Sequence, residues 1–97
     1  MIAHLVLFKL KPGVARDDAR VAAAAAAMSD LPRKIPAIKA WHHGFNLTAD
    51  EAAWDYGLHS AFAGEAELHG YFEHPAHLPV LERWNEIATL AFTDFKL

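Results

Sequence analysis

The chain has 97 residues, a length that suits one small domain, and 54% of them are hydrophobic against 22% that are charged. The net charge of −3 and the nine scattered Lys and Arg residues leave no basic stripe for phosphate groups, which argues against nucleic-acid binding. The absence of cysteine excludes disulfides, thiolate nucleophiles and cysteine-ligated zinc.

The chain begins with a segment, residues 2–10, whose side chains alternate as in a β-strand. His4, Val6 and Phe8 fall on one face of this strand, and the residues between them fall on the other. Because both faces are largely apolar, the strand should be covered on two sides. A Lys-Pro-Gly turn at residues 11–13 ends it.

A helix is expected over residues 14–31, because six consecutive alanines favour a helix and larger apolar side chains recur at helical spacing. Asp17 and Asp18 near its start suit the positive end of the helix dipole. Pro32 should end the helix, and residues 35–47 then alternate as a second strand.

The second half of the chain predicts two more strands with two helices between them. Residues 54–62 and 89–97 are expected to be strands, and residues 64–72 a short helix. A further helix should follow Pro75. Its inward-facing side chains are expected to be Leu78, Leu81 and Trp84, followed by Ile87 or Ala88.

The element order is therefore β-α-β-β-α-α-β, the ferredoxin-like or split βαβ arrangement with one additional helix. We expect an α+β fold in a single domain of residues 1–97, with a four-stranded antiparallel sheet and helices on one face only. The uncovered face should carry His4, Val6 and Phe8, and an apolar face of that size is costly to expose to water. A homodimer is expected, in which two apposed sheets form a barrel.

A polar cluster stands out in the stretch YFEHPAHLP, residues 71–79. Pro75 disfavours helical geometry at the residue before it, so Tyr71 should close one helix and His77 should lie in the first turn of the next. Two helices that meet at a corner can direct both side chains into one pocket. A neutral His77 could accept a proton there, while Tyr71 could donate a hydrogen bond to a developing enolate. The alternative is architectural: His77 bonds a backbone carbonyl and Tyr71 fills the core.

Other chemistries have less support in the sequence. His74 and His77 have the spacing of two metal ligands on a helix, but Pro75 breaks that helix, so we expect no metal site. His42 and His43 are neighbours on a strand and must point to opposite faces. No strand-turn-helix elbow carries a serine, so a serine nucleophile has little support. No glycine-rich phosphate loop is present, which argues against a nucleotide cofactor, and we expect no cofactor. An aromatic-lined flavin or haem pocket is the alternative, and it rests only on analogy of fold.

The chain resembles the stress-responsive dimeric α/β-barrel domain family, usually called Dabb. The resemblance lies in the stretches HLVLFKLKPG and IPAIKAWHHGFN, and in YFEHPAHLPVLERW followed by FTDF, which together span essentially the whole chain. It implies a barrel formed between two subunits, with a cavity in each protomer between the sheet and the helices. Members include plant polyketide cyclases, among them the enzyme that forms olivetolic acid.

The resemblance also implies roles for particular residues. The tyrosine and the histidine that the cyclases use match Tyr71 and His77, and a histidine from the first strand of their cavity matches His4. A further cavity histidine of the cyclases falls at Tyr56, so one wall of the pocket differs in its hydrogen bonding.

Three classes of function follow as hypotheses. The first is a cofactor-free acid–base cyclase or lyase acting on a carbonyl or polyketide-like compound, with Tyr71 and His77 as catalytic residues. The second is a non-catalytic module that binds a small apolar ligand, and the third is a purely structural stress-response dimer. In the first two, the ligand should contact a set of residues that we expect to be His4, Val6, Phe8, Tyr56 and His74.

The remaining expectations concern location and partners. The longest apolar run, residues 21–28, is mostly alanine and too short to span a bilayer, and the first residues show no signal-peptide pattern. We therefore expect a cytoplasmic protein with neither a membrane nor a nucleic acid as partner.

Overall fold

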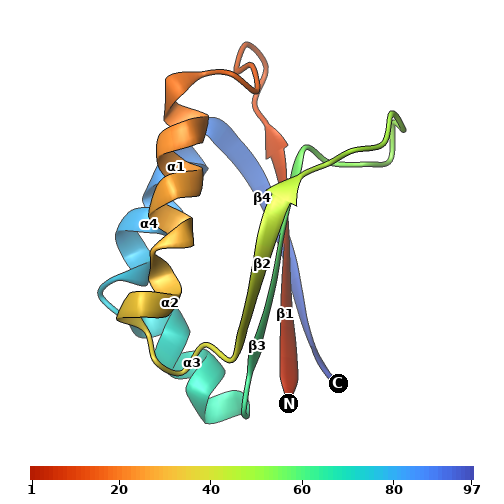
Figure 1. Cartoon of the computed structure of the whole chain (residues 1–97). Helices are drawn as coiled ribbons and strands as arrows, with labels where there is room; N and C mark the ends of the chain where they lie inside the picture. Colours follow the sequence, from red (N-terminus) through yellow and green to blue (C-terminus); the bar gives the residue numbers. More distant parts are fainter.

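The structure is a computed structural model that describes residues 1–97. Its elements, in chain order, are β1 (Ile2–Leu10), α1 (Ala19–Ser29), α2 (Leu31–Lys34), β2 (Ala40–Phe45), β3 (Tyr56–Phe62), α3 (Glu65–Glu73), α4 (His77–Ile87) and β4 (Ala88–Lys96). The strands form one antiparallel sheet in the order β2-β3-β1-β4. All helices lie on one side of this sheet, and its other side is bare (Figure 1). The ferredoxin-like fold predicted from the sequence is confirmed.

Residues 14–31 were predicted as one helix, but the structure has a shorter helix, α1, followed by the separate short helix α2. The helix α1 begins later, because the Asp18 side chain caps it by accepting a hydrogen bond from the backbone N–H of Arg20. Pro32 does not follow the last helix of this region but lies in the first turn of α2. A proline is tolerated there because the first N–H groups of a helix have no partner within it.

The face of β1 that was expected to be uncovered is in fact the covered one. His4, Val6 and Phe8 are only 4%, 7% and 2% exposed, and they lie under the helices. The bare face instead carries the alternate residues of β1, among them Leu7, which is 50% exposed. The prediction went wrong because both faces of this strand are apolar, and alternation alone does not say which face the helices cover.

The core lies between the sheet and the helices. Phe8 from β1 and Trp84 from α4 meet near its centre, with ring centroids 4.4 Å apart. Leu78, which was expected to face inward, is exposed, whereas Val80 is buried. The buried side of α4 runs through Val80, Trp84 and Ile87, which recur at helical spacing.

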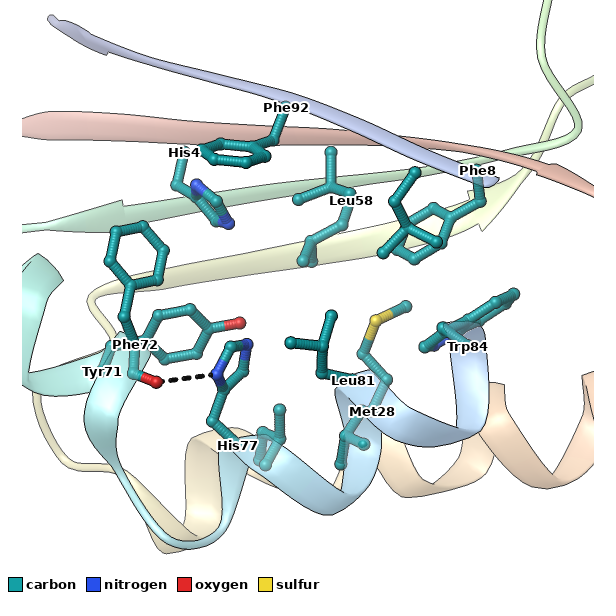
Figure 2. Close-up of a pocket in the computed structure, with 14 residues that line it drawn as sticks. His4, Phe8, Met28, Leu58, Tyr71, Phe72, His77, Leu81, Trp84 and Phe92 are labelled. Carbon is teal, nitrogen blue, oxygen red and sulfur yellow. Dashed lines mark hydrogen bonds between the residues drawn. The ribbon is translucent and has the colours of Figure 1, made fainter. Parts of the chain in front are cut away.

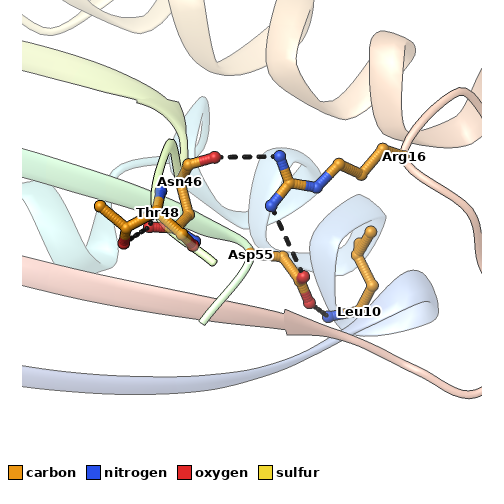
Figure 3. A network of polar contacts seen from close by, with 5 residues as sticks. All are labelled: Leu10, Arg16, Asn46, Thr48 and Asp55. Carbon is orange, nitrogen blue, oxygen red and sulfur yellow. Dashed lines mark hydrogen bonds and ion pairs between the residues drawn. The ribbon is translucent and has the colours of Figure 1, made fainter. Parts of the chain in front are cut away.

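An ionic and hydrogen-bonded network holds the loop before α1 to the β2–β3 hairpin (Figure 3). Arg16 donates a hydrogen bond of 3.0 Å to the carbonyl of Asn46 and lies 3.8 Å from the carboxylate of Asp55. Asp55 also accepts a hydrogen bond of 2.8 Å from the backbone N–H of Leu10. Three segments that are distant in the sequence are thus joined at one end of the sheet.

None of the helices is long and apolar enough to cross a membrane.

Candidate active site

The corner between α3 and α4 is built by the residues around Pro75. His74 has extended backbone angles, φ −64° and ψ 134°, as expected for the residue before a proline. The helix α3 therefore stops, and α4 begins at His77. The Nδ1 atom of His74 accepts a hydrogen bond of 3.0 Å from the backbone N–H of Ala76, so this imidazole stabilises the corner itself. The predicted helix break is confirmed.

Tyr71 and His77 meet at this corner, with ring centroids 4.4 Å apart. His77 donates a hydrogen bond of 3.2 Å from Nδ1 to the backbone carbonyl of Phe72, because a carbonyl oxygen can only accept. In the neutral ring Nε2 is then unprotonated, and it points into the pocket (Figure 2). The Tyr71 hydroxyl also points into the pocket and makes no hydrogen bond to the other residues drawn there.

Burial sets the protonation states of this pair. It lowers the pKa of His77, an effect that the hydrogen bond to Phe72 opposes and the neighbouring His4 and His74 reinforce. Burial raises the pKa of the Tyr71 hydroxyl far above its usual range. Near neutral pH the corner therefore offers a neutral imidazole that can accept a proton and a tyrosine that stays a hydrogen-bond donor.

His4 brings a third polar side chain to the same end of the pocket. Its Nδ1 lies 2.5 Å from Oδ1 of Asp94, the residue beside it on β4. Because a carboxylate accepts, Nδ1 donates, and Nε2 is the nitrogen left for a ligand. The His4 ring lies 5.9 Å from the ring of Tyr71 and 5.2 Å from that of Phe72.

These polar groups line one end of a cavity of about 280 Å³ between the sheet and the helices. The remaining lining is apolar, and Phe8, Met28 and Trp84 lie at the end away from Tyr71 (Figure 2). Phe92 is the most exposed part of the wall, at 66%, and it lies on the edge strand β4, so the cavity opens on that side.

The structure brings five of the seven expected ligand-contacting or catalytic residues together. His4, Val6, Phe8, Tyr71 and His77 all line the cavity. The two others do not. His74 is engaged in the corner described above, and Tyr56 lies behind the cavity wall, with its ring 5.8 Å from that of Phe8.

Sequence reasoning missed several lining residues and one that supports the site. The lining residues include Met28, Leu58, Phe72 and Phe92. Asp94, which holds His4, was missed as well. Leu58 lies on the same face of its strand as the expected Tyr56 and could have been found by alternation.

A second group of polar side chains joins α1, β2 and β3 outside the cavity. Ser29 donates a hydrogen bond of 3.1 Å to the carbonyl of Ala25, and its oxygen lies 3.0 Å from Nε2 of His43. Nδ1 of His43 lies 2.6 Å from the Tyr56 hydroxyl. The consistent pattern has Tyr56 donating to His43 and His43 donating to Ser29, which leaves no basic nitrogen to activate the serine. This chain of hydrogen bonds is structural.

The other histidines do not converge on a metal site. His43 points toward the helices, while His42 lies on the bare face and stacks on His59 at 5.9 Å, so the predicted opposite orientation of His42 and His43 is confirmed. No group of three or more His, Asp or Glu side chains is arranged to hold a metal ion.

Comparisons with known proteins relate this architecture to others. Residues 2–97 match the family model described as Stress responsive A/B Barrel Domain, Dabb. An uncharacterized protein of Streptomyces coelicolor is 38% identical over 96 residues, which is 99% of each chain.

Several solved structures share the fold. A dimeric ferredoxin-like protein of Thermobifida fusca has a TM-score of 0.87 at 27% identity, covering 99% of this chain and 90% of that one. A dimeric protein with a ferredoxin-like fold from Bacteroides fragilis has a TM-score of 0.84 at 27% identity, covering 99% and 95%. The hydroxynitrile lyase of Passiflora edulis has a TM-score of 0.86 and covers 99% and 92%, but at 18% identity it shares the fold alone.

Proposed function

Because the chain belongs to the stress-responsive A/B barrel domain (Dabb) family, we propose that it is a homodimer whose protomers each bind a small, largely apolar carbonyl compound and act on it by acid–base chemistry. One observation carries this proposal. A hydrogen-bond donor, the Tyr71 hydroxyl, and an unprotonated imidazole nitrogen, Nε2 of His77, share the polar end of an otherwise apolar cavity.

In the proposed reaction His77 is the general base and Tyr71 the group that stabilises negative charge. Nε2 removes a proton from the carbon next to the carbonyl, and the electron pair moves onto the carbonyl oxygen to form an enolate. The Tyr71 hydroxyl donates a hydrogen bond to that oxygen, where charge develops in a largely apolar site. His4, held by Asp94, contacts the ligand from the sheet side. A ring closure and a lyase reaction can both use this pair of groups.

The lining also restricts the ligand. No Lys or Arg side chain lines the cavity, so a phosphate or carboxylate would be buried there without a cation to pair with it. A neutral aldehyde or ketone avoids this cost. The apolar end with Phe8, Met28 and Trp84 suits a hydrocarbon or aromatic group on the same molecule.

A non-catalytic binding module is the second candidate function. It is favoured by the hydrogen bond from His77 to the Phe72 carbonyl, because a histidine that stabilises a helix corner is useful to the fold without any reaction.

Proton exchange tests the catalytic proposal without knowledge of the natural substrate. Acetophenone and heptan-2-one are incubated with the protein in D₂O, and loss of the proton signal next to the carbonyl is followed by NMR. We expect exchange above the buffer rate for at least one probe, and about a 10²–10⁴-fold loss of the protein-dependent rate in His77→Ala. The exposed His69, on the same helix as Tyr71, gives the control variant His69→Ala, which should keep the wild-type rate.

Two results would count against catalysis. Saturable binding of either probe without exchange above the buffer rate supports the binding module. Equal exchange by His77→Ala and the wild type would show that His77 is not the base.

The homodimer is supported by the bare sheet face and by the dimeric relatives from Thermobifida and Bacteroides. Leu7 and Phe95, which are 50% and 44% exposed, lie on that face, and a second copy would remove them from water. Sedimentation velocity at micromolar concentration should give a dimer, and a stable folded monomer would contradict this part of the proposal.

A further inference from the structure

The bare face of the sheet has a hollow of about 660 Å³ whose floor includes Gly44 and Gly57. These two glycines are directly opposite each other on β2 and β3. The same row continues to Leu7 on β1 and Ala91 on β4. One large side chain, Leu7, therefore stands beside two residues without side chains. We call the depression over Gly44 and Gly57 the hollow.

The protomer itself does not explain these glycines. Gly13 is the single residue with a positive φ, so neither Gly44 nor Gly57 is needed for its backbone angles. A Cβ atom built on Gly44 would meet nothing within 4 Å, and one on Gly57 would meet only the carbonyl oxygen of Val6 at 3.9 Å. A glycine inside a strand weakens it, because it loses more conformational entropy on folding and packs no side chain.

The pairing of β2 with β3 is regular and has no bulge, and a glycine in such a strand often marks a place where another chain or a ligand approaches closely. We propose that the hollow receives Leu7 of a second copy, and that the hollow of that copy receives Leu7 in return. This inference rests on the homodimer proposed above and assigns the residues that fix how the two sheets fit together.

The arrangement of Leu7 and the hollow suits a two-fold axis. In a symmetric dimer the same patch serves both subunits, so a protrusion on one copy must meet a depression on the other. An axis that runs along the strands, between β1 and β3, carries Leu7 of each copy across to Gly57 of the other, with Gly44 beside it on β2. Both contacts then form together, and each buries a leucine that is half exposed in the protomer.

The test fills the hollow from within the protomer. Gly57→Leu places a side chain where the partner's leucine would lie, and Gly44→Val places one beside it. In the protomer, a Cβ atom at either position meets nothing closer than 3.9 Å. By sedimentation velocity we expect each variant to raise the dimer dissociation constant roughly tenfold or more, which is typical of an overpacked contact. Circular dichroism should show unchanged secondary structure. Gly70→Ala, a glycine on α3 with equally free space, is the matched control and should leave the dimer intact.

A compensating variant identifies the occupant. In Gly57→Leu combined with Leu7→Ala the protrusion and the depression exchange places, so two-fold symmetry predicts that dimerisation returns toward the wild-type value. A dimer that persists in Gly57→Leu and Gly44→Val would overturn the inference. Dissociation without rescue by Leu7→Ala would overturn the assignment of Leu7. A wild-type monomer would overturn the homodimer as well, whereas a loss of proton exchange alone leaves this inference untouched.

Discussion

His77 makes a hydrogen bond to Phe72 through Nδ1 and directs Nε2 into the cavity, and the proposal gives these two atoms different roles. These roles are separable. Replacement by alanine removes one hydrogen bond, which contributes about 0.5–1.5 kcal/mol, and the contact of one face of the ring with Tyr71, while the rest of the ring borders the cavity. We expect His77→Ala to lower the melting temperature by only a few degrees while it lowers the exchange rate about 10²–10⁴-fold. A fall of tens of degrees by differential scanning calorimetry would show that the residue mainly supports the corner.

The pKa of His77 and that of His43 are both lowered by burial from the usual value of 6.5, so the folded state holds these protons less tightly than the unfolded state. The stability that the neutral rings provide is therefore present above pH 6.5 and is lost as the pH falls below it. The free energy of unfolding in urea should be lower at about pH 5 than at about pH 8. His43→Gln should reduce this difference, and an unchanged difference would contradict the assignment to His43.

The sequence was informative about Tyr71 and His77 because a local signal, Pro75, fixes the geometry between them. Asp94 had no such signal. Its contact with His4 joins residues 90 positions apart, and it depends on how the first strand is aligned with the last. Tyr56 was placed on the correct face of its strand, but its position beside Phe8 and outside the cavity could not be known before the helices were placed.

At the level of elements, short-range signals gave the order of helices and strands, and their ends were less certain. The final helix shows why. Leu78 was expected to face inward because it is large and apolar, but the helix begins at His77 and its buried stripe passes through Val80 and Trp84. A hydrophobic residue in the first turn of a helix can lie on either side, since the first turn alone does not define the stripe.

The network around Asp55 gives an element-level prediction. Asp55→Ala removes the acceptor of the Leu10 N–H and leaves that partly buried group unpaired, which should cost about 1–3 kcal/mol. Arg16→Ala removes an exposed cation and should cost less than about 1 kcal/mol. Urea unfolding of both variants measures the difference. Equal losses would show that the ion pair, rather than the backbone hydrogen bond, holds the loop to the hairpin.

At the level of the whole molecule, the sequence predicted that one sheet face would be bare but assigned the wrong one. Both faces of β1 carry apolar residues, which is typical of a strand that is covered on each side. The feature that separates the faces is the presence of Gly44, Gly57 and Ala91 in the row that contains Leu7, and that row becomes visible only when the strands are aligned.

Neighbouring residues on β1 make this assignment testable. Val6→Asp puts a carboxylate under the helices without a cation, so the protein should fail to fold. Leu7→Asp puts the same group on the bare face, where the protomer should stay folded and the dimer should dissociate. Circular dichroism and sedimentation velocity distinguish the two outcomes, and an unfolded Leu7→Asp variant would contradict the assignment of faces.

The sheet is a single layer between the cavity and the hollow, and Val6, Leu58 and Phe92 border both. The side chains of these residues face the cavity and their backbone lies under the hollow, so a ligand that shifts them from the helix side would also shift the surface that a second copy meets. Thermodynamic linkage makes such an effect reciprocal: the factor by which a ligand strengthens dimerisation equals the factor by which dimerisation strengthens ligand binding. The apparent affinity for a small molecule should then rise with protein concentration, and dilution alone should release the ligand.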